Sequence, residues 1–261
     1  MSIIMKDYGV VVIVRDEERL IEDCLKAIHD ADAVTIVVVV DSRTKDSTFV
    51  IARRYTTHVL ITDGNRGHLR NVGYERLNLP YVVYIDADNR ITPGYMEALR
   101  GKMAEDSKLS NVGGAQMQKG GSLLGRLDCE YLNYRRAVGA GGMMYRTEAL
   151  EDAGGFNNDL NVGEDGELQH RLVDLRWKHG WTGDIFFEHY YADSYKVWLN
   201  KMSHGSAAGL DLRGLLRLLA SPMMGIHAAW IRKKPSMLWY IPLRSLVILL
   251  GPGKKDEYMP S

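Results

Sequence analysis

Residues 81–88 read YVVYIDAD, an apolar run that ends on two acidic residues separated by one position. Tyr and Val favour extended backbone, so the run predicts a buried strand with Asp86 and Asp88 at its carboxyl end. Ligands of open α/β sheets bind outside the carboxyl ends of the strands, and two carboxylates placed there can share a divalent cation. Asp is also a common turn residue, so the motif by itself leaves a cation site and a plain polar turn equally open.

The sequence before this motif alternates apolar runs with helical patterns. Runs at residues 9–14, 34–40 and 59–62 predict further strands, and the first two are apolar throughout, as in strands buried on both faces. The segments between them place apolar residues at helical spacing, for example Leu20, Cys24 and Ile28. This alternation predicts an α/β fold, Rossmann-like, with a mostly parallel sheet flanked by helices.

The pattern loosens after residue 90. Further strands are predicted at residues 112–117, 143–145 and 185–187, and further helices around residues 96–103, 123–136 and 146–153. Another helix, starting at Asp165, is expected to carry Leu168, Leu172 and Leu175 inward and to end near Gly180.

Composition excludes several classes of protein. The chain has 261 residues, with 33 Lys+Arg against 33 Asp+Glu, and 46% of its residues are hydrophobic. Such a chain has ample apolar material for a core, which excludes disorder, and it has no overall basic excess, which argues against nucleic acid as a partner. Its 2 Cys cannot form a disulfide framework, so a reducing, cytoplasmic location is expected.

The charge is unevenly distributed along the chain. Residues 210–261 hold 8 Lys+Arg and 3 Asp+Glu, so the remainder is net acidic. This segment is also apolar, but Pro222 and Pro242 interrupt it, and no stretch reaches the roughly 20 apolar residues that span a bilayer. We expect a domain of residues 1–209 and a helical extension of residues 210–261. The extension either lies on an anionic membrane surface, at the cytoplasmic face, or packs on the sheet.

Two further charged residues, one at a strand end and one near a helix start, are candidates for binding a ligand. Asp41 ends the strand predicted at residues 34–40, on the same edge as Asp86, where it either accepts hydrogen bonds from a nucleobase or ribose or serves as a turn residue. Arg70 lies near a predicted helix N-terminus, where it either contributes to an anion site or is a solvated helix residue. The chain has neither Gly-x-Gly-x-x-Gly after its first strand nor the Gly-Lys-Ser/Thr ending of a P-loop.

A second acidic pair, Glu164 and Asp165, follows Gly163 at the start of a predicted helix. One interpretation is an acidic cap on the free amides of the helix. The other is a general base, which typically accelerates a reaction by about 10²–10⁴-fold. His189, after the last predicted strand, is either a further metal ligand or a structural residue.

Taken in order, these motifs resemble those of the family 2 glycosyltransferases, inverting enzymes with the GT-A fold. The resemblance runs from about residue 10 to residue 189. It rests on VRDEE (residues 14–18), VDSRTKDST (40–48), NRGHLRNVG (65–73), DAD (86–88), GGF (154–156) and GED (163–165).

The resemblance implies a role for each matching residue. It assigns the nucleotide to Arg15, Glu17, Asp41 and Arg70, the ribose or the metal to Asp86, the metal to Asp88 and His189, and the catalytic base to Asp165 in its pair with Glu164. It further implies a nucleotide-binding half over about residues 1–90 and an acceptor-binding half over about residues 91–209. The implied reaction moves one sugar, with inversion, from a UDP- or GDP-linked donor to a hydroxyl, using Mg²⁺ or Mn²⁺. The acceptor is a glycan, a lipid-linked molecule or a protein.

The chain departs from the family pattern beside the expected donor. Asp16 replaces the usual Asn, Arg43 replaces Gly and Lys45 replaces Thr, and the motif at residues 65–73 is about one residue short. The processive members carry Gln-x-x-Arg-Trp, and here Val173 stands at the Gln position, which favours single-sugar transfer.

Two alternatives remain at this stage. A sugar-phosphate nucleotidylyltransferase would share the sheet and the metal, but it should carry a Gly-rich loop after the first strand, and residues 14–18 contain no glycine. A binding module for nucleotide sugars that has lost turnover is the non-enzymatic alternative, against which only the retention of both acidic pairs argues.

Overall fold

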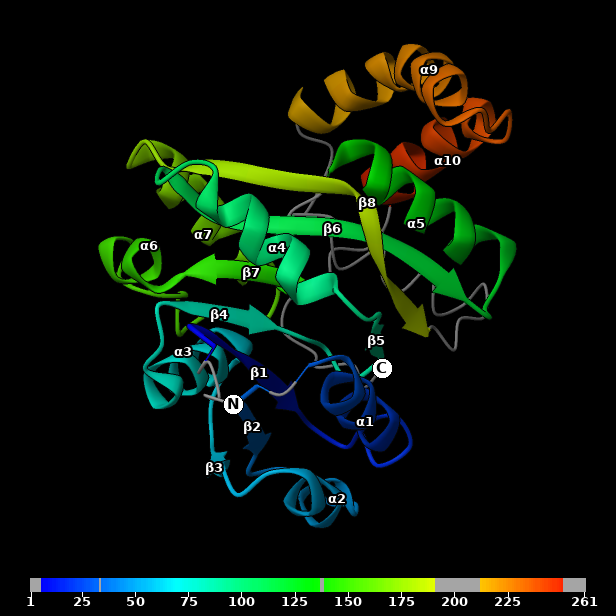
Figure 1. The fold of residues 1–261 in the computed structure, drawn as a ribbon. Helices are drawn as coiled ribbons and strands as arrows, with labels where there is room; N and C mark the ends of the chain where they lie inside the picture. The colour runs from blue at the N-terminus through cyan, green and yellow to red at the C-terminus, as the bar shows by residue number, and fades with distance from the viewer. Residues whose placement is uncertain (1–5, 33, 137–138, 191–211, 251–261) are drawn as a thin grey trace. The chain divides into compact units, whose positions relative to one another are not determined.

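A computed structural model describes residues 6–32, 34–136, 139–190 and 212–250 (Figure 1). The chain divides into two compact units. The first holds the described residues of 1–117 and 138–189, and the second holds those of 118–137 and 190–259. The boundary predicted after Gly209 falls in residues 191–211, outside the described residues.

The strands are β1 (Tyr8–Val14), β2 (Ile36–Asp41), β3 (Val59–Thr62), β4 (Tyr81–Tyr84), β5 (Asn89–Ile91), β6 (Leu109–Lys119), β7 (Met143–Arg146) and β8 (Lys178–Tyr190). The helices of the first unit are α1 (Ile21–Ala31), α2 (Thr48–Tyr55), α3 (Arg66–Leu77), α4 (Tyr95–Ala104), α6 (Thr147–Asp152) and α7 (Glu164–Asp174). The second unit contains α5 (Leu123–Arg135), α9 (Leu212–Arg232) and α10 (Met237–Leu250).

The strands form one sheet in the order β3-β2-β1-β4-β7-β6-β8-β5. β1 pairs in parallel with β2 and β4, and β3 pairs in parallel with β2. The pairs β4 with β7, β6 with β7 and β5 with β8 are antiparallel. The predicted α/β sheet flanked by helices is therefore confirmed, and its parallel part is the part that the first strand–helix alternation predicted.

Both faces of the sheet are covered by helices. Val10 and Val12 of β1 join a core with α1, α2 and α4, whereas Val11 joins a core with α3, α6 and α7. Successive side chains of a strand point to opposite faces, so covering both faces requires the unbroken apolar runs seen in β1 and β2.

The end of α7 differs from the prediction. The helix ends at Asp174, Leu175 is 49% exposed instead of buried, and Gly180 lies inside β8. The left-handed residue after the helix is Arg176, with φ 67°. Gly180 is needed for packing, because a Cβ there would come within 2.9 Å of Val112 Cγ2.

In the second half of the sheet, one strand was not predicted and another is longer than predicted. β5 was not predicted, since Ile91 is the apolar residue of a three-residue strand, and it depends on its pairing with β8. β8 itself runs over 13 residues and includes His189, which was expected after the strand.

The C-terminal helices continue through their prolines. Pro222 lies inside α9 and Pro242 inside α10, although both were expected to interrupt the apolar segments. Among the described residues, no helix has the length and apolar character required to cross a membrane.

Candidate active site

The carboxyl ends of β1, β2 and β4 meet at one edge of the sheet because these strands run parallel. Strand order reverses at β1, where β2 lies on one side and β4 on the other, and ligands of α/β sheets bind at such switch points. The residues predicted for donor and metal that lie at or just after these ends are Arg15, Glu17, Asp41, Asp86 and Asp88.

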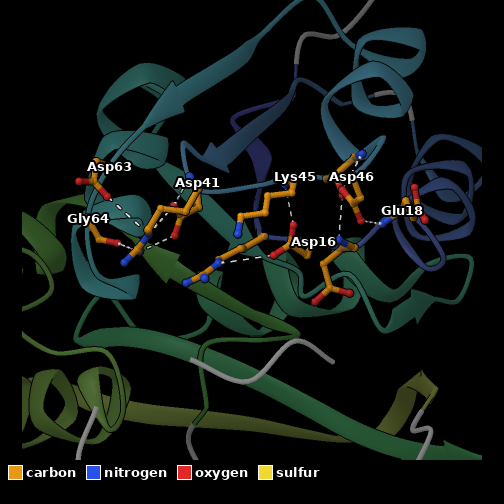
Figure 2. A network of polar contacts seen from close by, with 11 residues as sticks. Asp16, Glu18, Asp41, Lys45, Asp46, Asp63 and Gly64 are labelled. Atoms are coloured by element: carbon orange, nitrogen blue, oxygen red, sulfur yellow. Dashed lines mark hydrogen bonds and ion pairs between the residues drawn. The ribbon is translucent and has the colours of Figure 1, made fainter. Parts of the chain in front are cut away.

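The segments after β1 and β2 are tied together by hydrogen bonds between backbone amides and side-chain oxygens (Figure 2). Lys45 N donates to Asp16 Oδ1 (2.8 Å), Glu18 N to Asp46 Oδ2 (2.9 Å), Ser47 N to Glu18 Oε2 (3.1 Å) and Glu17 N to Thr48 Oγ1 (2.8 Å). The Lys45 contact uses the backbone, so Lys in place of the family's Thr preserves it. Loops fixed in this way lose little freedom when a ligand binds.

Asp16 has a conformational role. Its φ of 54° is left-handed, a region that among residues with a side chain Asn and Asp tolerate best. Asp in place of the family's Asn therefore preserves the turn. Its carboxylate also lies 3.7 Å from Arg15 Nε.

Arg43 binds the carboxylate of Asp41. Its backbone N and its Nε each donate to Asp41 Oδ1 at 2.8 Å, and Nη2 donates to Asp41 Oδ2 at 2.5 Å (Figure 2). Nη2 also donates to the carbonyl of Gly64 at 2.8 Å. Burial by itself raises the pKa of Asp41, but the hydrogen bonds and charge of Arg43, together with the charge of Arg15, hold this pKa below its usual value. A base or ribose that binds Asp41 therefore has to exchange with, or add to, the Arg43 contacts.

Arg43 was noticed in the sequence only as a departure from the family's Gly, and no role was predicted for it. Asp41 is 1% exposed and Glu17 is 6% exposed, so both predicted nucleotide ligands are buried. Arg43 is the more accessible partner, with 42% of its side chain exposed.

Arg70, from α3, is the buried link between two motifs. Its Nε donates to Glu164 Oε1 at 3.3 Å, and its Nη2 lies 3.7 Å from Asp86 Oδ1. Burial lowers the pKa of Arg70, but Asp86 and Glu164 together raise it above its usual value. The guanidinium also lies over the rings of Tyr84 and Phe156, at 5.5 and 5.8 Å from their centroids. Arg70 thus stays charged and holds the strand-end carboxylate near the start of α7.

Asp86 is contacted by a side chain of α1 and by the backbone at Gly141. Cys24 Sγ, from α1, donates to the carbonyl of Asp86 at 3.4 Å. On the other side Gly141 approaches so closely that a Cβ there would overlap Asp86 Oδ2. Position 141 therefore has no room for a side chain, which explains the glycine.

The two acids at the start of α7 have different environments. Glu164 is 3% exposed, and burial raises its pKa, an effect that Arg70 partly offsets. Asp165 is half-buried, and its Oδ1 accepts from Gly166 N, one of the first amides of α7, at 2.7 Å. Asp165 Oδ2 lies toward Gly139, at 3.6 Å from a Cβ built there. Glu164 is engaged with Arg70, whereas Asp165 keeps partial access to solvent.

Asn71, one residue after Arg70, was not singled out in the sequence. Its Nδ2 donates to the carbonyl of Phe156 and its Oδ1 accepts from Phe156 N, both at 2.8 Å. Nδ2 also donates to Asn158 Oδ1 at 2.8 Å. These bonds fix the segment before Glu164 against α3. The only indication of this role in the sequence was the position of Asn71 within the motif at residues 65–73.

Asp88 and His189 are brought together by the pairing of β5 with β8. Asn89 is the register partner of His189, and His189 Nε2 lies 2.9 Å from Asp88 Oδ2. Asp86, the third predicted metal residue, instead lies near Arg70. Among the described residues, no group of three His, Cys, Asp or Glu side chains is arranged to hold a metal ion. One carboxylate and one imidazole nevertheless fit a divalent cation that also takes oxygen ligands from a substrate diphosphate and water.

Fold and site define the class: the chain has the GT-A fold of glycosyltransferases, with carboxylates gathered at the carboxyl ends of its parallel strands. It belongs to glycosyl transferase family 2, whose family model matches residues 9–151, more than half of the chain. This membership favours sugar transfer over the nucleotidylyltransferase alternative. The match ends before Glu164, Asp165 and His189, so the roles of these residues depend on geometry.

Solved structures share the fold at low identity. The mannosyltransferase PcManGT from Pyrobaculum calidifontis, in complex with GDP-Man and Mn²⁺, is 16% identical with a TM-score of 0.62, over 95% of this chain and 88% of that one. TarS from S. aureus, in complex with UDP-GlcNAc, is 15% identical with a TM-score of 0.57, over 93% and 84%. Glucosyl-3-phosphoglycerate synthase from Mycobacterium tuberculosis, in complex with Mg²⁺ and UDP, is 15% identical with a TM-score of 0.57, over 76% and 74%.

Proposed function

We propose that the protein transfers one sugar, with inversion, from a nucleotide-diphospho sugar to an acceptor hydroxyl. The observation that carries this proposal is the position of Arg70, which contacts Asp86 after β4 and Glu164 at the start of α7. A donor held at the strand ends and a base at the helix start would then lie in one site. The neighbouring structures with GDP-Man, UDP-GlcNAc and UDP support a UDP- or GDP-linked donor.

Asp88 and His189 are the residues we assign to a Mg²⁺ or Mn²⁺ ion, which would neutralise the charge of a leaving diphosphate. The support is their 2.9 Å contact and the metal ions of two of the neighbouring structures. Asp86 is assigned to the ribose or to an outer contact of the cation, because its carboxylate is shared with Arg70.

Asp165 is assigned as the general base that takes the proton of the acceptor hydroxyl while its oxygen attacks the anomeric carbon. Its partial exposure supports this choice over Glu164, which is buried against Arg70. Glu164 then acts as a positioning residue that holds Arg70. Arg15, Glu17, Asp41 and Arg70 complete the donor contacts in this proposal, with Arg43 added beside Asp41.

The acceptor is proposed to carry a hydroxyl, on a glycan, a lipid-linked molecule or a protein, because a phosphate acceptor would need no base. The proposal includes a cytoplasmic location, with an anionic membrane surface as a partner of residues 210–261. The exposed apolar face of α9 supports that partner.

A donor panel tests the reaction. The protein is incubated with UDP- and GDP-linked sugars, with and without a chelator, and the release of nucleoside diphosphate is measured with candidate hydroxyl acceptors. We expect release from one donor, loss of release with chelator, and loss of metal-dependent donor binding in Asp88→Asn but not in the control Asp30→Asn on α1, whose side chain is 56% exposed.

Other outcomes identify the alternatives. Release of pyrophosphate would favour nucleotidylyl transfer, and tight donor binding without turnover on any acceptor would favour a binding module. Full turnover in the presence of chelator would remove the metal from the proposal.

A further inference from the structure

α9 exposes an apolar stripe along one face. Its members recur every three or four residues, as one face of a helix requires, and are exposed by more than half: Leu216 (56%), Leu219 (67%), Met223 (77%), Ile226 (62%) and Trp230 (80%). A helix of a globular protein normally presents polar residues on its outer face. This α9 stripe therefore needs an explanation outside ordinary packing.

The core of the second unit is complete without the α9 stripe. Ala228, on the opposite face of α9, packs with Met237, Tyr240 and Ile241 of α10 and with Leu127 of α5. α10 is the more apolar helix by composition, and Met237, Tyr240 and Ile241 are its buried contributions to this core. α10 also exposes Leu238 (49%), Trp239 (45%) and Leu246 (40%), but the members of the α9 stripe are exposed further.

The acids of this unit are engaged in internal contacts. Asp128 of α5 accepts from Arg244 Nε at 2.8 Å and from the hydroxyl of Tyr240 at 2.9 Å. Glu130 of α5 is paired with Arg232, whose Nη2 lies 2.9 Å from Glu130 Oε2.

The unit is strongly basic. Residues 118–136 and 212–250 contain ten Lys and Arg side chains but only two Asp and Glu side chains, which are the two acids of α5. Lys233, directly after α9, is exposed, and Trp230 lies one turn before it. An apolar helix face in a basic unit, with Trp and Lys at the helix end, matches the headgroup boundary of an anionic bilayer.

We propose that α9 binds the surface of an anionic lipid bilayer, with the α9 stripe buried among the headgroups and upper acyl chains. Charge argues against pairing of the α9 stripe with the α9 stripe of a second copy, because two basic units repel each other. The inference deepens the membrane part of the proposed function. Its test needs no sugar transfer, so either proposal can fail alone.

The test is cosedimentation of the full chain with vesicles of phosphatidylcholine containing phosphatidylglycerol, compared with vesicles of phosphatidylcholine alone. We expect binding to the anionic vesicles, weakened by salt because headgroup attraction is screened. The double variant M223E/I226E should bind at least about tenfold more weakly, since it brings charge into an apolar boundary. The matched control is Val50→Glu in α2, with a side chain 57% exposed, and it should bind like the wild type.

A second measurement tests the proposal without the double variant, in case M223E/I226E does not fold. The tryptophan emission of the wild type minus that of Trp230→Phe should shift to the blue with anionic vesicles, because Trp230 enters an apolar environment. Absence of vesicle binding by the wild type, or equal binding by M223E/I226E, would overturn the proposal. Concentration-dependent dimerisation that M223E/I226E abolishes, without vesicle binding, would assign the stripe to a second copy instead.

Discussion

The two units depart from ordinary burial in opposite directions. The first buries charged side chains, with Arg70 4%, Glu164 3% and Asp41 1% exposed, whereas the second exposes Met223 by 77% and Trp230 by 80%. Charged groups are rarely buried unless paired, and large apolar faces are rarely exposed. The buried charges compensate one another within the unit, through Arg70 with Glu164 and Arg43 with Asp41. Among the described residues of the second unit the α9 stripe has no such compensation, and the partner that we propose for it is a membrane surface.

The largest effect is expected at Asp165, where the two interpretations of the acidic pair diverge. Asp165→Asn keeps an acceptor for Gly166 N but removes the base, so transfer should fall by about 10²–10⁴-fold while donor binding is retained. Turnover and donor affinity are measured separately, with Asp174→Asn at the exposed end of the same helix as control. Transfer at the wild-type rate would leave Asp165 only its capping role.

Loss of Arg70 should break the buried charge cluster. Arg70→Met leaves Glu164 buried without its partner, and breaking a buried pair in this way lowers the free energy of unfolding by about 3–5 kcal/mol. Denaturant unfolding measures the change, with Arg76→Met on the exposed face of α3 as control.

A double-variant cycle with Glu164→Gln sharpens the Arg70 result. The combined loss of stability should be smaller than the sum of the single losses, because both substitutions remove the same interaction. Additive losses would show that the pair is not coupled.

Asn71→Ala should lower both stability and transfer. The substitution leaves the buried amide and carbonyl of Phe156 without their side-chain partner, which costs about 1–3 kcal/mol for each group. Asn158→Ala removes only one bond to the same side chain and should have a smaller effect. If Asn71→Ala lowered stability but left transfer per folded molecule unchanged, the segment before Glu164 would not position the base.

The pH dependence of donor affinity in Arg43→Gly tests whether the donor binds the Asp41 carboxylate that Arg43 contacts. In the wild type the lowered pKa keeps Asp41 ionised near neutrality, so donor affinity that depends on this carboxylate should vary little there. Arg43→Gly removes the side-chain hydrogen bonds and the charge that lower the pKa of Asp41 but keeps the backbone N–H, so this pKa should rise relative to the wild type and donor affinity should begin to fall at a higher pH. Donor titrations across pH measure this, and a flat profile in Arg43→Gly would exclude Asp41 as a donor ligand.

The smallest effect is expected for stability at the α9 stripe. Met223→Glu replaces an exposed side chain, so the free energy of unfolding should change by no more than about 0.5 kcal/mol, in contrast to Arg70→Met. Ala228→Glu, on the buried face of the same helix, should destabilise the protein strongly and serves as the comparison. A large loss in Met223→Glu would mean that the stripe is packed within the protein.

Much of the site was predictable because its residues occur at strand ends. The apolar runs of β1, β2 and β4 predicted parallel strands, and parallel strands bring Asp41, Asp86 and Asp88 to one edge. The contacts of Arg43 were not predictable, since its side chain reaches Gly64 after another strand. Asn71 was missed for the same reason, because its partners lie 85 and 87 residues away in the sequence.

The sequence by itself determined the class of fold, the strand ends and the family, because alternation of apolar runs and short polar motifs are local properties. Only the tertiary structure decided which acid pairs with Arg70, that His189 lies against Asp88, and which side chains of α9 form the exposed stripe. Those outcomes depend on strand pairing and helix packing between residues distant in sequence, where burial and charge compensation select one partner among several that the sequence allows.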